Sequence, residues 1–370
     1  MAEDNNHKNH NSALKVNEGV EQPGSVSRDA VSRYKKFSRQ LLQPEEYFNG
    51  ILDGNMIMLS KAITLVESTN PDHHEIAQQI IEKCLPYSGK SLRIGITGVP
   101  GVGKSTFIEV LGKELTSTGH KLAVLAIDPS SSRTKGSILG DKTRMEELST
   151  DKNAFIRPSP SAGSLGGVAR KTKESIILCE TAGFDVIFVE TVGVGQSEVA
   201  VHSMVDFFLL LMLAGAGDEL QGIKRGIMEM ADSIFINKAD GDNLQKARQA
   251  KGEYKNALHL FPPTESGWIP RVGTCSAQTR EGITDVWETI KQYEVFTKSN
   301  GYFIQKRQEQ KKMIMFQTIN ESLKNDFYQN KSLKNLLIKT ENELLNDKIS
   351  SYVAAQKLIG IYYKNRGEVG

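Results

Sequence analysis

The sequence predicts an α/β protein whose core is a mainly parallel sheet flanked by helices, with helical extensions at both ends. Between Ser91 and Ser299, short apolar runs alternate with stretches of helical periodicity, which is typical of parallel strands joined by crossover helices. The segments on either side show helical periodicity without a strand pattern. These observations lead us to expect one sheet-containing core over 91–299 with helical additions before and after it.

The two ends of the chain are expected to differ in order. Residues 1–33 are polar and lack periodicity, so we expect a disordered tail there. Over 34–90 apolar residues recur at helical spacing on both sides of a turn at Asn70-Pro71, which predicts a small helical domain. The region 300–370 is rich in Lys, Gln, Glu and Leu without a strand pattern, and two or three helices are expected.

The strands of the core are expected where short apolar runs occur. The longest run, from Phe207 to Ala216, has about half of the ~20 residues that a membrane-spanning helix requires, so we interpret it as a buried strand. The stretch from Arg157 to Gly167 is rich in Gly, Ser and Pro, and we expect an ordered loop there, either functional or merely connecting. The expected strands are 92–97, 122–127, 184–190, 206–213, 233–237 and 269–275.

Composition narrows the possible classes of protein. A hydrophobic content of 39% and a charged content of 24% are typical of a soluble globular chain. Because 46 basic residues nearly balance 44 acidic ones, no affinity for nucleic acid or membranes follows. The amino terminus fits neither a secretory signal nor a transit peptide, so we expect a cytoplasmic protein. Cys84, Cys179 and Cys275 lie far apart, which argues against disulfides and against a thiolate metal site.

A phosphate-binding motif follows the first expected strand. The strand runs directly into a complete G-x-x-x-x-G-K-S that opens a helical stretch, which is the context the motif requires. Backbone N–H groups of such a loop wrap phosphate oxygens at a helix N-terminus. Lys104 is expected to span the β- and γ-phosphates as a catalytic residue, and the Ser105 hydroxyl is expected to bind Mg²⁺. The expected nucleotide-binding residues here are Gly98, Val99, Pro100, Gly101, Val102, Gly103, Lys104, Ser105 and Thr106.

The identity of the base is predicted by an N-K-x-D element that follows the strand 233–237 and ends at Asp240. The two acceptor oxygens of an aspartate match the N1–H and N2 amino donors of guanine, whereas adenine offers no such pair. A second short segment after the last expected strand resembles the final base-contacting loop of GTPases. The expected base-contacting residues are Asn237, Lys238, Asp240, Ser276, Ala277 and Gln278. The sequence therefore predicts GTP and GDP as ligands.

A candidate switch segment begins at Glu190, at the end of the strand 184–190, where most GTPases have D-x-x-G. A carboxylate there can hold Mg²⁺, so Glu190 is a candidate catalytic and metal-site residue, and the N–H of Gly193 can contact the γ-phosphate. Position 194 is Val rather than the glutamine that orients attacking water in many GTPases, and the nearest glutamine is Gln196. We therefore expect slow intrinsic hydrolysis.

Two further carboxylates are candidate metal-site residues. Asp128 ends the strand 122–127, and the carboxyl ends of strands are where ligands bind in open α/β sheets. Asp141 lies in a polar, Gly-bearing segment beyond it. The alternative for Asp128 is a turn-forming residue without a ligand, and for Asp141 the two interpretations are equally supported.

Longer strings extend the match beyond a generic GTPase. Over residues of roughly 40 to 300, the chain resembles the MeaB, ArgK and MMAA family of P-loop GTPases, whose relatives were formerly labelled transport ATPases for lysine, arginine and ornithine. Asp240 argues against that older label, because it indicates guanine. The strings that carry the resemblance are 62–68, 157–172, 190–198, 216–224 and 237–242.

The resemblance implies a G-protein chaperone of adenosylcobalamin-dependent acyl-CoA mutases, typically methylmalonyl-CoA mutase. Such proteins gate cofactor loading and protect or reactivate the mutase. They commonly form homodimers through carboxyl-terminal helices, which here would be 300–370. The stretch from Ala214 to Lys224 resembles an additional mobile switch that couples the nucleotide state to the partner.

Three alternatives remain open from the residues themselves. The nucleotide could be a structural ligand in a binding module whose turnover no partner stimulates. The protein could be a nickel- or zinc-insertion GTPase, although such proteins usually carry Cys- or His-rich metal motifs that this sequence lacks. A small-molecule kinase would also use a P-loop, but the N-K-x-D element argues against it.

Overall fold

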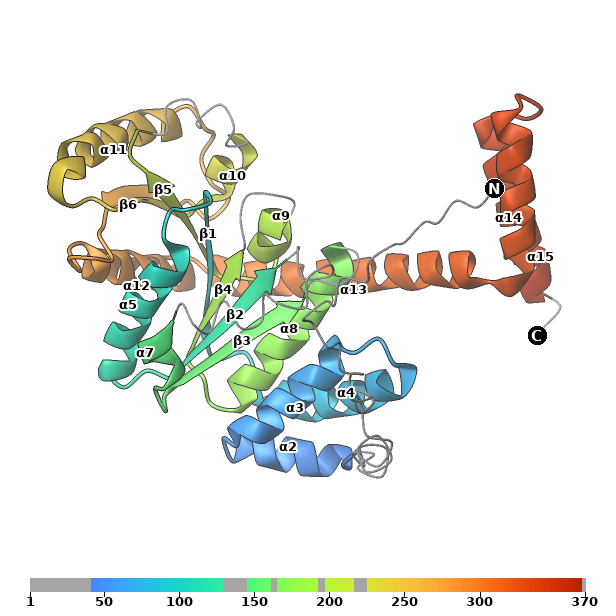
Figure 1. The fold of residues 1–370 in the computed structure, drawn as a ribbon, viewed down its shortest axis with the longest axis horizontal. Helices are drawn as coiled ribbons and strands as arrows, with labels where there is room; N and C mark the ends of the chain where they lie inside the picture. Colours follow the sequence, from blue (N-terminus) through green and yellow to red (C-terminus); the bar gives the residue numbers. More distant parts are fainter. Residues whose placement is uncertain (1–40, 129–144, 161–164, 192–196, 216–224, 368–370) are drawn as a thin grey trace, which may run out of the picture. The chain divides into compact units, whose positions relative to one another are not determined.

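The computed structural model describes residues 41–128, 145–160, 165–191, 197–215 and 225–367. Its strands are β1 (Leu92–Gly98), β2 (Leu122–Asp128), β3 (Ala154–Pro160), β4 (Val186–Thr191), β5 (Phe207–Leu213), β6 (Ser233–Asn237) and β7 (Arg271–Thr274). They form one sheet in the order β3-β2-β4-β1-β5-β6-β7, and every neighbouring pair is parallel (Figure 1). The predicted fold class, a parallel sheet flanked by helices, is therefore confirmed.

The central strand β1 is packed from both faces of the sheet. Ile94 pairs with Phe188 of β4 and with Phe207 of β5, and none of the three side chains is exposed. Strands buried on both faces read as continuous apolar runs, which is why the sequence revealed them. Because all neighbouring strands are parallel, their carboxyl ends share one edge, the edge at which ligands bind in such sheets.

The expectation of a loop from Arg157 to Gly167 is wrong for most of that stretch. Residues 154–160 form β3, which pairs along its length with β2, and Gly167 lies within the helix that begins at Leu165. β3 is an edge strand with one strand neighbour in the sheet. Proline lacks the N–H that a central strand needs, but an edge strand tolerates it, and Pro158 and Pro160 lie here.

Helices connect the strands and cover the sheet. α5 contacts β1 and β2, and α12 contacts α5 as well as β5 and β7, so these two helices lie together. α9 contacts β1, β4 and α8. The connecting helices are α5 (Lys104–Ser117), α7 (Glu146–Ser149), α8 (Leu165–Thr181), α9 (Ser197–His202), α10 (Arg225–Met230), η2 (Gly241–Asn243), α11 (Leu244–Leu258) and α12 (Ile283–Ser299).

A small group of helices precedes the sheet: α2 (Pro44–Leu52), α3 (Met56–Glu67), α4 (Pro71–Cys84) and η1 (Leu85–Tyr87). The carboxylate of Glu67, at the end of α3, forms an ion pair with Arg157 of β3 and accepts a hydrogen bond from the Ser159 hydroxyl at 2.6 Å. Lys171 of α8 donates to the Glu67 carbonyl at 2.8 Å. Two of the strings that carry the family resemblance therefore meet at Glu67.

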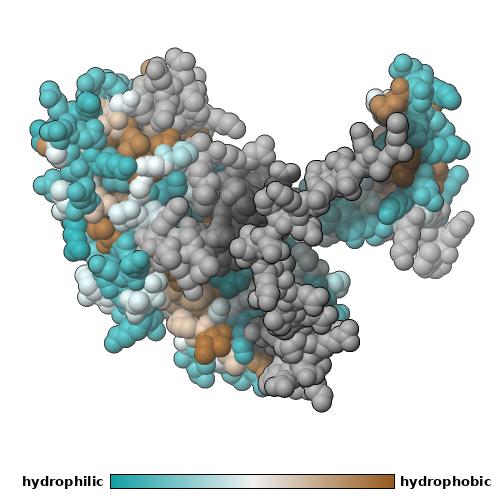
Figure 2. All heavy atoms as spheres, in the orientation of Figure 1, coloured by the Kyte–Doolittle hydropathy of each residue, from teal (hydrophilic) through white to brown (hydrophobic). Residues whose placement is uncertain are grey.

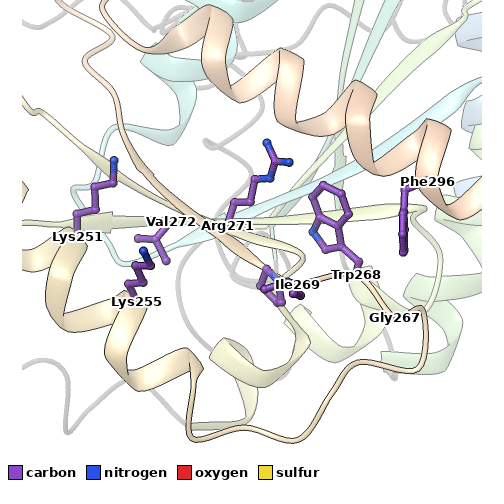
Figure 3. Close-up of a pocket in the computed structure, with 9 residues that line it drawn as sticks. Lys251, Lys255, Gly267, Trp268, Ile269, Arg271, Val272 and Phe296 are labelled. Carbon is purple, nitrogen blue, oxygen red and sulfur yellow. The ribbon is translucent and has the colours of Figure 1, made fainter.

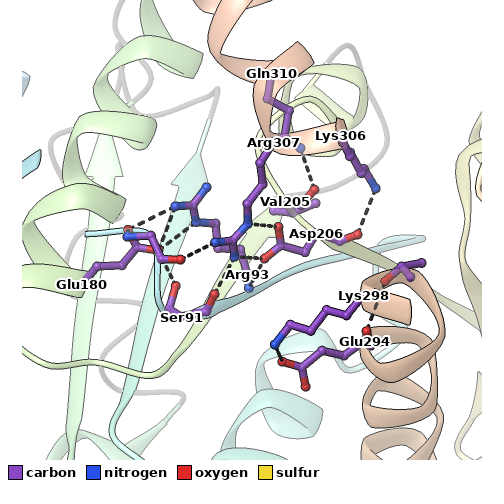
Figure 4. Close-up of polar contacts among 12 residues, drawn as sticks. Ser91, Arg93, Glu180, Val205, Asp206, Glu294, Lys298, Lys306, Arg307 and Gln310 are labelled. Carbon is purple, nitrogen blue, oxygen red and sulfur yellow. Dashed lines mark hydrogen bonds and ion pairs between the residues drawn. The ribbon is translucent and has the colours of Figure 1, made fainter. Parts of the chain in front are cut away.

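The long helix α13 (Tyr302–Gln329) begins beside the amino ends of β1 and β5, within a network of charged side chains (Figure 4). Arg307 donates to both carboxylate oxygens of Asp206 at 2.7 and 2.6 Å, and the carboxylate of Asp206 also accepts from the Arg93 N–H at 2.8 Å. The Arg93 guanidinium donates to both oxygens of Glu180, at 2.9 and 3.1 Å. Burial raises the pKa of Asp206, but Arg307 and Arg93 outweigh it and hold that pKa below its usual value.

Two more helices, α14 (Lys331–Leu345) and α15 (Ser351–Gly367), pack against each other after α13. Together the helices from α13 onward expose several large apolar side chains, among them Phe316, Tyr352 and Tyr363. Figure 2 shows a mostly hydrophilic face of the described residues, with small apolar patches. None of the helices in the described part of the chain combines the length and apolar character needed to cross a membrane.

Candidate nucleotide-binding site

The loop between β1 and α5 has a backbone that only glycine adopts easily. Gly98 has a φ of 155°, and a Cβ atom built on it would lie 2.3 Å from the carbonyl oxygen of Leu211 in β5. Gly101 has a φ of 77°, and the place a side chain would take there has no atom within 4 Å. The loop thus forms an open cradle, and α5 begins directly after it, with its first N–H groups lacking intrahelical acceptors. This arrangement fits a bound phosphate chain.

Lys104, the first residue of α5, is held against this loop. Its side chain is largely buried, and the ammonium donates to the carbonyl oxygen of Gly98 at 2.9 Å and lies 3.5 Å from that of Val99. Burial lowers the pKa of Lys104, while the negative charges of Glu190 and Glu198 oppose this shift. The Lys104 ammonium is therefore held at the cradle by loop carbonyls, and the negative charges of Glu190 and Glu198 favour its charged form.

Glu198 is a neighbour of the site that the sequence analysis did not single out. Its side chain, on the short helix α9, is fully buried, and its charge acts on Lys104. The residue lies within the string 190–198 that carries the family resemblance, so the sequence analysis had already drawn attention to its segment. What the sequence does not reveal is that α9 folds back against β1 and brings this carboxylate near the loop.

Two side-chain oxygens lie together at this edge of the sheet, one on Ser105 in the first turn of α5 and one on Glu190 near the end of β4. The Ser105 hydroxyl donates to the carboxylate of Glu190 with an oxygen separation of 3.3 Å, and Glu190 is almost completely buried in β4. Hydroxyl and carboxylate oxygens are the ligands that Mg²⁺ prefers, so this pair fits the expected metal. Asp128 is the last residue of β2, the strand beside β4, and the structure does not describe its side chain. Asp141 and Gly193 lie outside the described residues.

The N-K-x-D element is tied directly to the phosphate loop. Asn237, at the end of β6, donates from its side-chain amide to the carbonyl oxygen of Val102 at 2.8 Å. The thiol of Cys275 lies 3.7 Å from the Asn237 amide oxygen, to which it donates. Asn237 therefore acts as a brace between the two loops, in addition to any contact with a ligand.

The two predicted base-contacting loops meet in space although 36 residues separate their paired side chains. The Ser276 hydroxyl donates to the carboxylate of Asp240 and accepts from the N–H groups of Gln278 and Thr279 at 3.2 and 3.1 Å. The N–H of Ala239 donates to the carbonyl of Cys275 at 3.0 Å. Asp240 is thus oriented by the neighbouring loop, as a carboxylate must be if it is to recognise one base.

A family model described as "Methylmalonyl Co-A mutase-associated GTPase MeaB" matches residues 59–332. A crystal structure titled "LAO/AO transport system kinase" resembles the chain with a TM-score of 0.71 and 36% identity, covering 88% of this chain and 100% of that one.

Several curated proteins are similar over most of their length. A protein named probable GTPase from Mycobacterium tuberculosis is 48% identical over 308 residues, covering 83% of this chain and 92% of the relative. The methylmalonic aciduria type A homolog, mitochondrial, of Mus musculus is 46% identical over 325 residues, covering 85% and 78%. The GTPase ArgK of Escherichia coli is 44% identical over 313 residues, covering 85% and 95%. With the family model spanning most of the sequence, this chain belongs to the methylmalonyl Co-A mutase-associated GTPase family, MeaB.

Proposed function

We propose that this GTPase uses the GTP cycle to gate cofactor loading of an adenosylcobalamin-dependent mutase of the methylmalonyl-CoA type, and to protect or reactivate that mutase. The observation that carries the nucleotide part is the convergence of Lys104, the Ser105–Glu190 pair and the Asp240–Ser276 pair at one edge of the sheet. The name of the family and of its mouse relative supports the choice of partner.

Each part of the edge has a distinct task in this proposal. The open cradle around Gly101 and the N-terminus of α5 bind the phosphates through backbone N–H groups. Lys104 swings from the loop carbonyls to the β- and γ-phosphate oxygens, where its charge offsets the charge that develops as the terminal phosphate leaves. Ser105 and Glu190 would hold Mg²⁺, which supplies further charge neutralisation when bound.

Selection of guanine rests on Asp240 in the same proposal. Its carboxylate accepts from the N1–H and N2 amino group of guanine, and the Ser276 hydroxyl fixes its orientation. Asn237 holds the base-reading loop at the right distance from the phosphate loop through its bond to Val102. In this proposal, guanine selection depends on Asp240, Ser276 and Asn237 rather than on the segment around Gly193.

The partner is expected to raise a slow intrinsic rate, because Val194 stands where many GTPases have a water-orienting glutamine. Phosphate release is measured with and without purified methylmalonyl-CoA mutase, and at least ~10-fold acceleration is expected, about 1.4 kcal/mol of barrier. The Lys104→Ala variant with mutase is the matched control and should show no acceleration. Equal rates at concentrations where the complex forms would contradict the proposal and favour a binding module without stimulated turnover.

We also propose that residues 300–370 mediate homodimerisation. The exposed apolar side chains on α13, α14 and α15 support this, since such side chains are commonly covered by a partner. The mass in solution measured by light scattering tests it, with a Phe316→Glu and Tyr352→Glu double variant expected to be a monomer. A cytoplasmic location stays a prediction of the sequence.

A further inference from the structure

A groove crosses the sheet edge formed by β7, far along the strand order from the phosphate loop. It has a volume of about 580 Å³ and lies between α11, which contributes Lys251 and Lys255, and α12, which contributes Phe296 (Figure 3). Residues 267–272 form its floor. The groove therefore combines basic side chains on one side with an apolar floor and wall.

The charges of the groove lack counterions within the described part of the chain. Lys251 and Lys255 are exposed and four residues apart on α11, so they share one face of that helix. Neither lysine nor Arg271 belongs to any ion pair among the described residues. No acidic residue lines the groove, although Glu229 lines the adjoining hollow beneath residues 262–270. The groove is thus complementary to negative charge.

Two lysines of the neighbouring helix α12 have a different environment. On α12, Lys291 and Lys298 both bind the carboxylate of Glu294. Those charges are compensated within the helix, whereas the charges of α11 that face the groove are not. Water solvates these exposed cations in the free protein, and an anionic group bound in the groove would pair with them.

Buried contacts of Trp268 hold the floor of the groove, and Ile269 adds apolar surface to it. Trp268 is almost completely buried. Its indole N–H donates to the carbonyl of Asp232 at 3.0 Å, and its ring packs on Phe296 at a centroid distance of 5.7 Å. The guanidinium of Arg271 lies over the Trp268 ring at 5.1 Å. Ile269 is 79% exposed, so it offers apolar surface beside the cations.

These features favour a protein segment over a small molecule. Small-molecule sites enclose their ligand and hold it with a few buried polar groups, but the cations here lie on exposed side chains at the rim. β7 is an edge strand of four residues with one strand neighbour in the sheet. An edge strand can pair through its backbone with an added extended segment, whose side chains then contact the flanking helices.

We propose that the groove formed by Lys251, Lys255, Ile269, Arg271 and Phe296 is the docking surface for an extended acidic segment of the partner mutase. This inference rests on the proposed function. Acidic side chains of the segment pair with the lysines of α11, and an apolar side chain covers Ile269. The surface lies on a different edge of the sheet from the phosphate loop, so docking does not block nucleotide binding.

The test is the affinity of purified methylmalonyl-CoA mutase for the full chain, measured by interferometry with GTP or GDP present. The Lys251→Glu and Lys255→Glu double variant should bind at least about 10-fold more weakly at 0.1 M salt, mainly through slower association. That difference should shrink at 1 M salt, where the Debye length falls from about 10 Å to about 3 Å. Ile269→Ser should weaken binding by a salt-independent factor, since it removes apolar contact only.

The matched control is the Lys246→Glu and Arg248→Glu double variant, which reverses two exposed charges on α11 outside the groove and should bind like the wild type. All variants should bind GTP normally, which shows that they are folded. If the mutase binds the wild type and the groove variants equally, the docking surface is wrong while the proposed function stands. If it binds none of them in either nucleotide state, the partner assignment fails and the docking proposal fails with it.

Discussion

At its amino end β1 meets a closed network of charged side chains, whereas at its carboxyl end it runs into a loop built to receive a ligand. In the network, Arg93, Glu180, Asp206 and Arg307 satisfy one another with short hydrogen bonds, and the Asp206 side chain is 1% exposed. At the other end, Lys104 donates to loop carbonyls, and the space at Gly101 is open.

The difference between these ends shows how one strand can serve stability and function at once. A buried charge is costly unless all its hydrogen bonds are made, so the network at the amino end is stable only when complete. The phosphate loop instead keeps backbone N–H donors available for a ligand. These donors form strong hydrogen bonds only when a phosphate is bound. We therefore expect mutations at the amino end to change stability and those at the carboxyl end to change nucleotide chemistry.

The largest effect is expected from Arg307→Met. Loss of the guanidinium leaves the Asp206 carboxylate buried without its main partner, and the free energy of unfolding should fall by about 3–5 kcal/mol. Urea denaturation without nucleotide measures this. Lys298→Met, which breaks the ion pair between an exposed lysine and Glu294, is the control and should cost less than about 1 kcal/mol. Equal losses in the two variants would mean that the network does not stabilise the fold as proposed.

Lys104→Ala should affect the carboxyl end alone. Removal of the cation is expected to lower kcat for GTP hydrolysis by about 10²- to 10³-fold, or about 3–4 kcal/mol of barrier, with little change in the stability of the nucleotide-free protein. Phosphate release under saturating GTP is the measurement. Lys113 lies on the same helix, but its ammonium donates a hydrogen bond to Asp151. The Lys113→Met variant should therefore hydrolyse GTP at the wild-type rate. Wild-type turnover by Lys104→Ala would exclude this lysine from the reaction.

A smaller effect is expected for Asp240→Asn, which exchanges an acceptor for a donor. GTP affinity should drop by roughly 10- to 150-fold, since a hydrogen bond to a charged group contributes about 1.5–3 kcal/mol. Xanthosine triphosphate should be favoured, because xanthine has a carbonyl where guanine has its amino group. Competition between GTP and xanthosine triphosphate for the site measures this preference. Asp242→Asn, which changes an exposed carboxylate, is the control. An unchanged preference for GTP would show that another group reads the base.

The smallest effect, counted over one pH unit, concerns Lys173, a buried lysine beside the network. Burial and the neighbouring charge of Arg93 lower its pKa to about 7, against an ordinary value of 10.5. Between those values the unfolded chain holds one proton more than the folded chain. The free energy of unfolding should therefore rise with pH from about 7 towards 10, by at most about 1.4 kcal/mol per pH unit.

Urea denaturation from pH 7 to 9 checks this linkage. The pH-dependent contribution of Lys173 to the free energy of unfolding should be absent in Lys173→Met. The free energy of unfolding of the wild type should therefore increase relative to that of the variant as the pH rises. The exposed Lys152→Met should run parallel to the wild type. If the Lys173→Met curve also runs parallel, this lysine does not titrate in that range in the folded protein.

The sequence by itself predicted the parallel sheet, the phosphate loop and the base-reading element. These features are local: each buried strand is a continuous apolar run, and Gly98 to Ser105 form one uninterrupted motif. A guanine-selective carboxylate is also legible in four consecutive residues ending at Asp240. The residues assigned to these elements stay predictions of ligand contact, but their meeting at one edge follows from the parallel topology.

Only the tertiary structure decided the rest, because those features depend on pairs distant in the sequence. β3 could not be predicted, since Pro158 and Pro160 hide an edge strand that exists through pairing with β2. The charged network joins Arg93 to Glu180, 87 residues away, and Arg307 to Asp206, 101 residues away. Single charged residues read as solvated surface until the fold buries them against a partner, and no spacing rule connects residues brought together by different strands and helices.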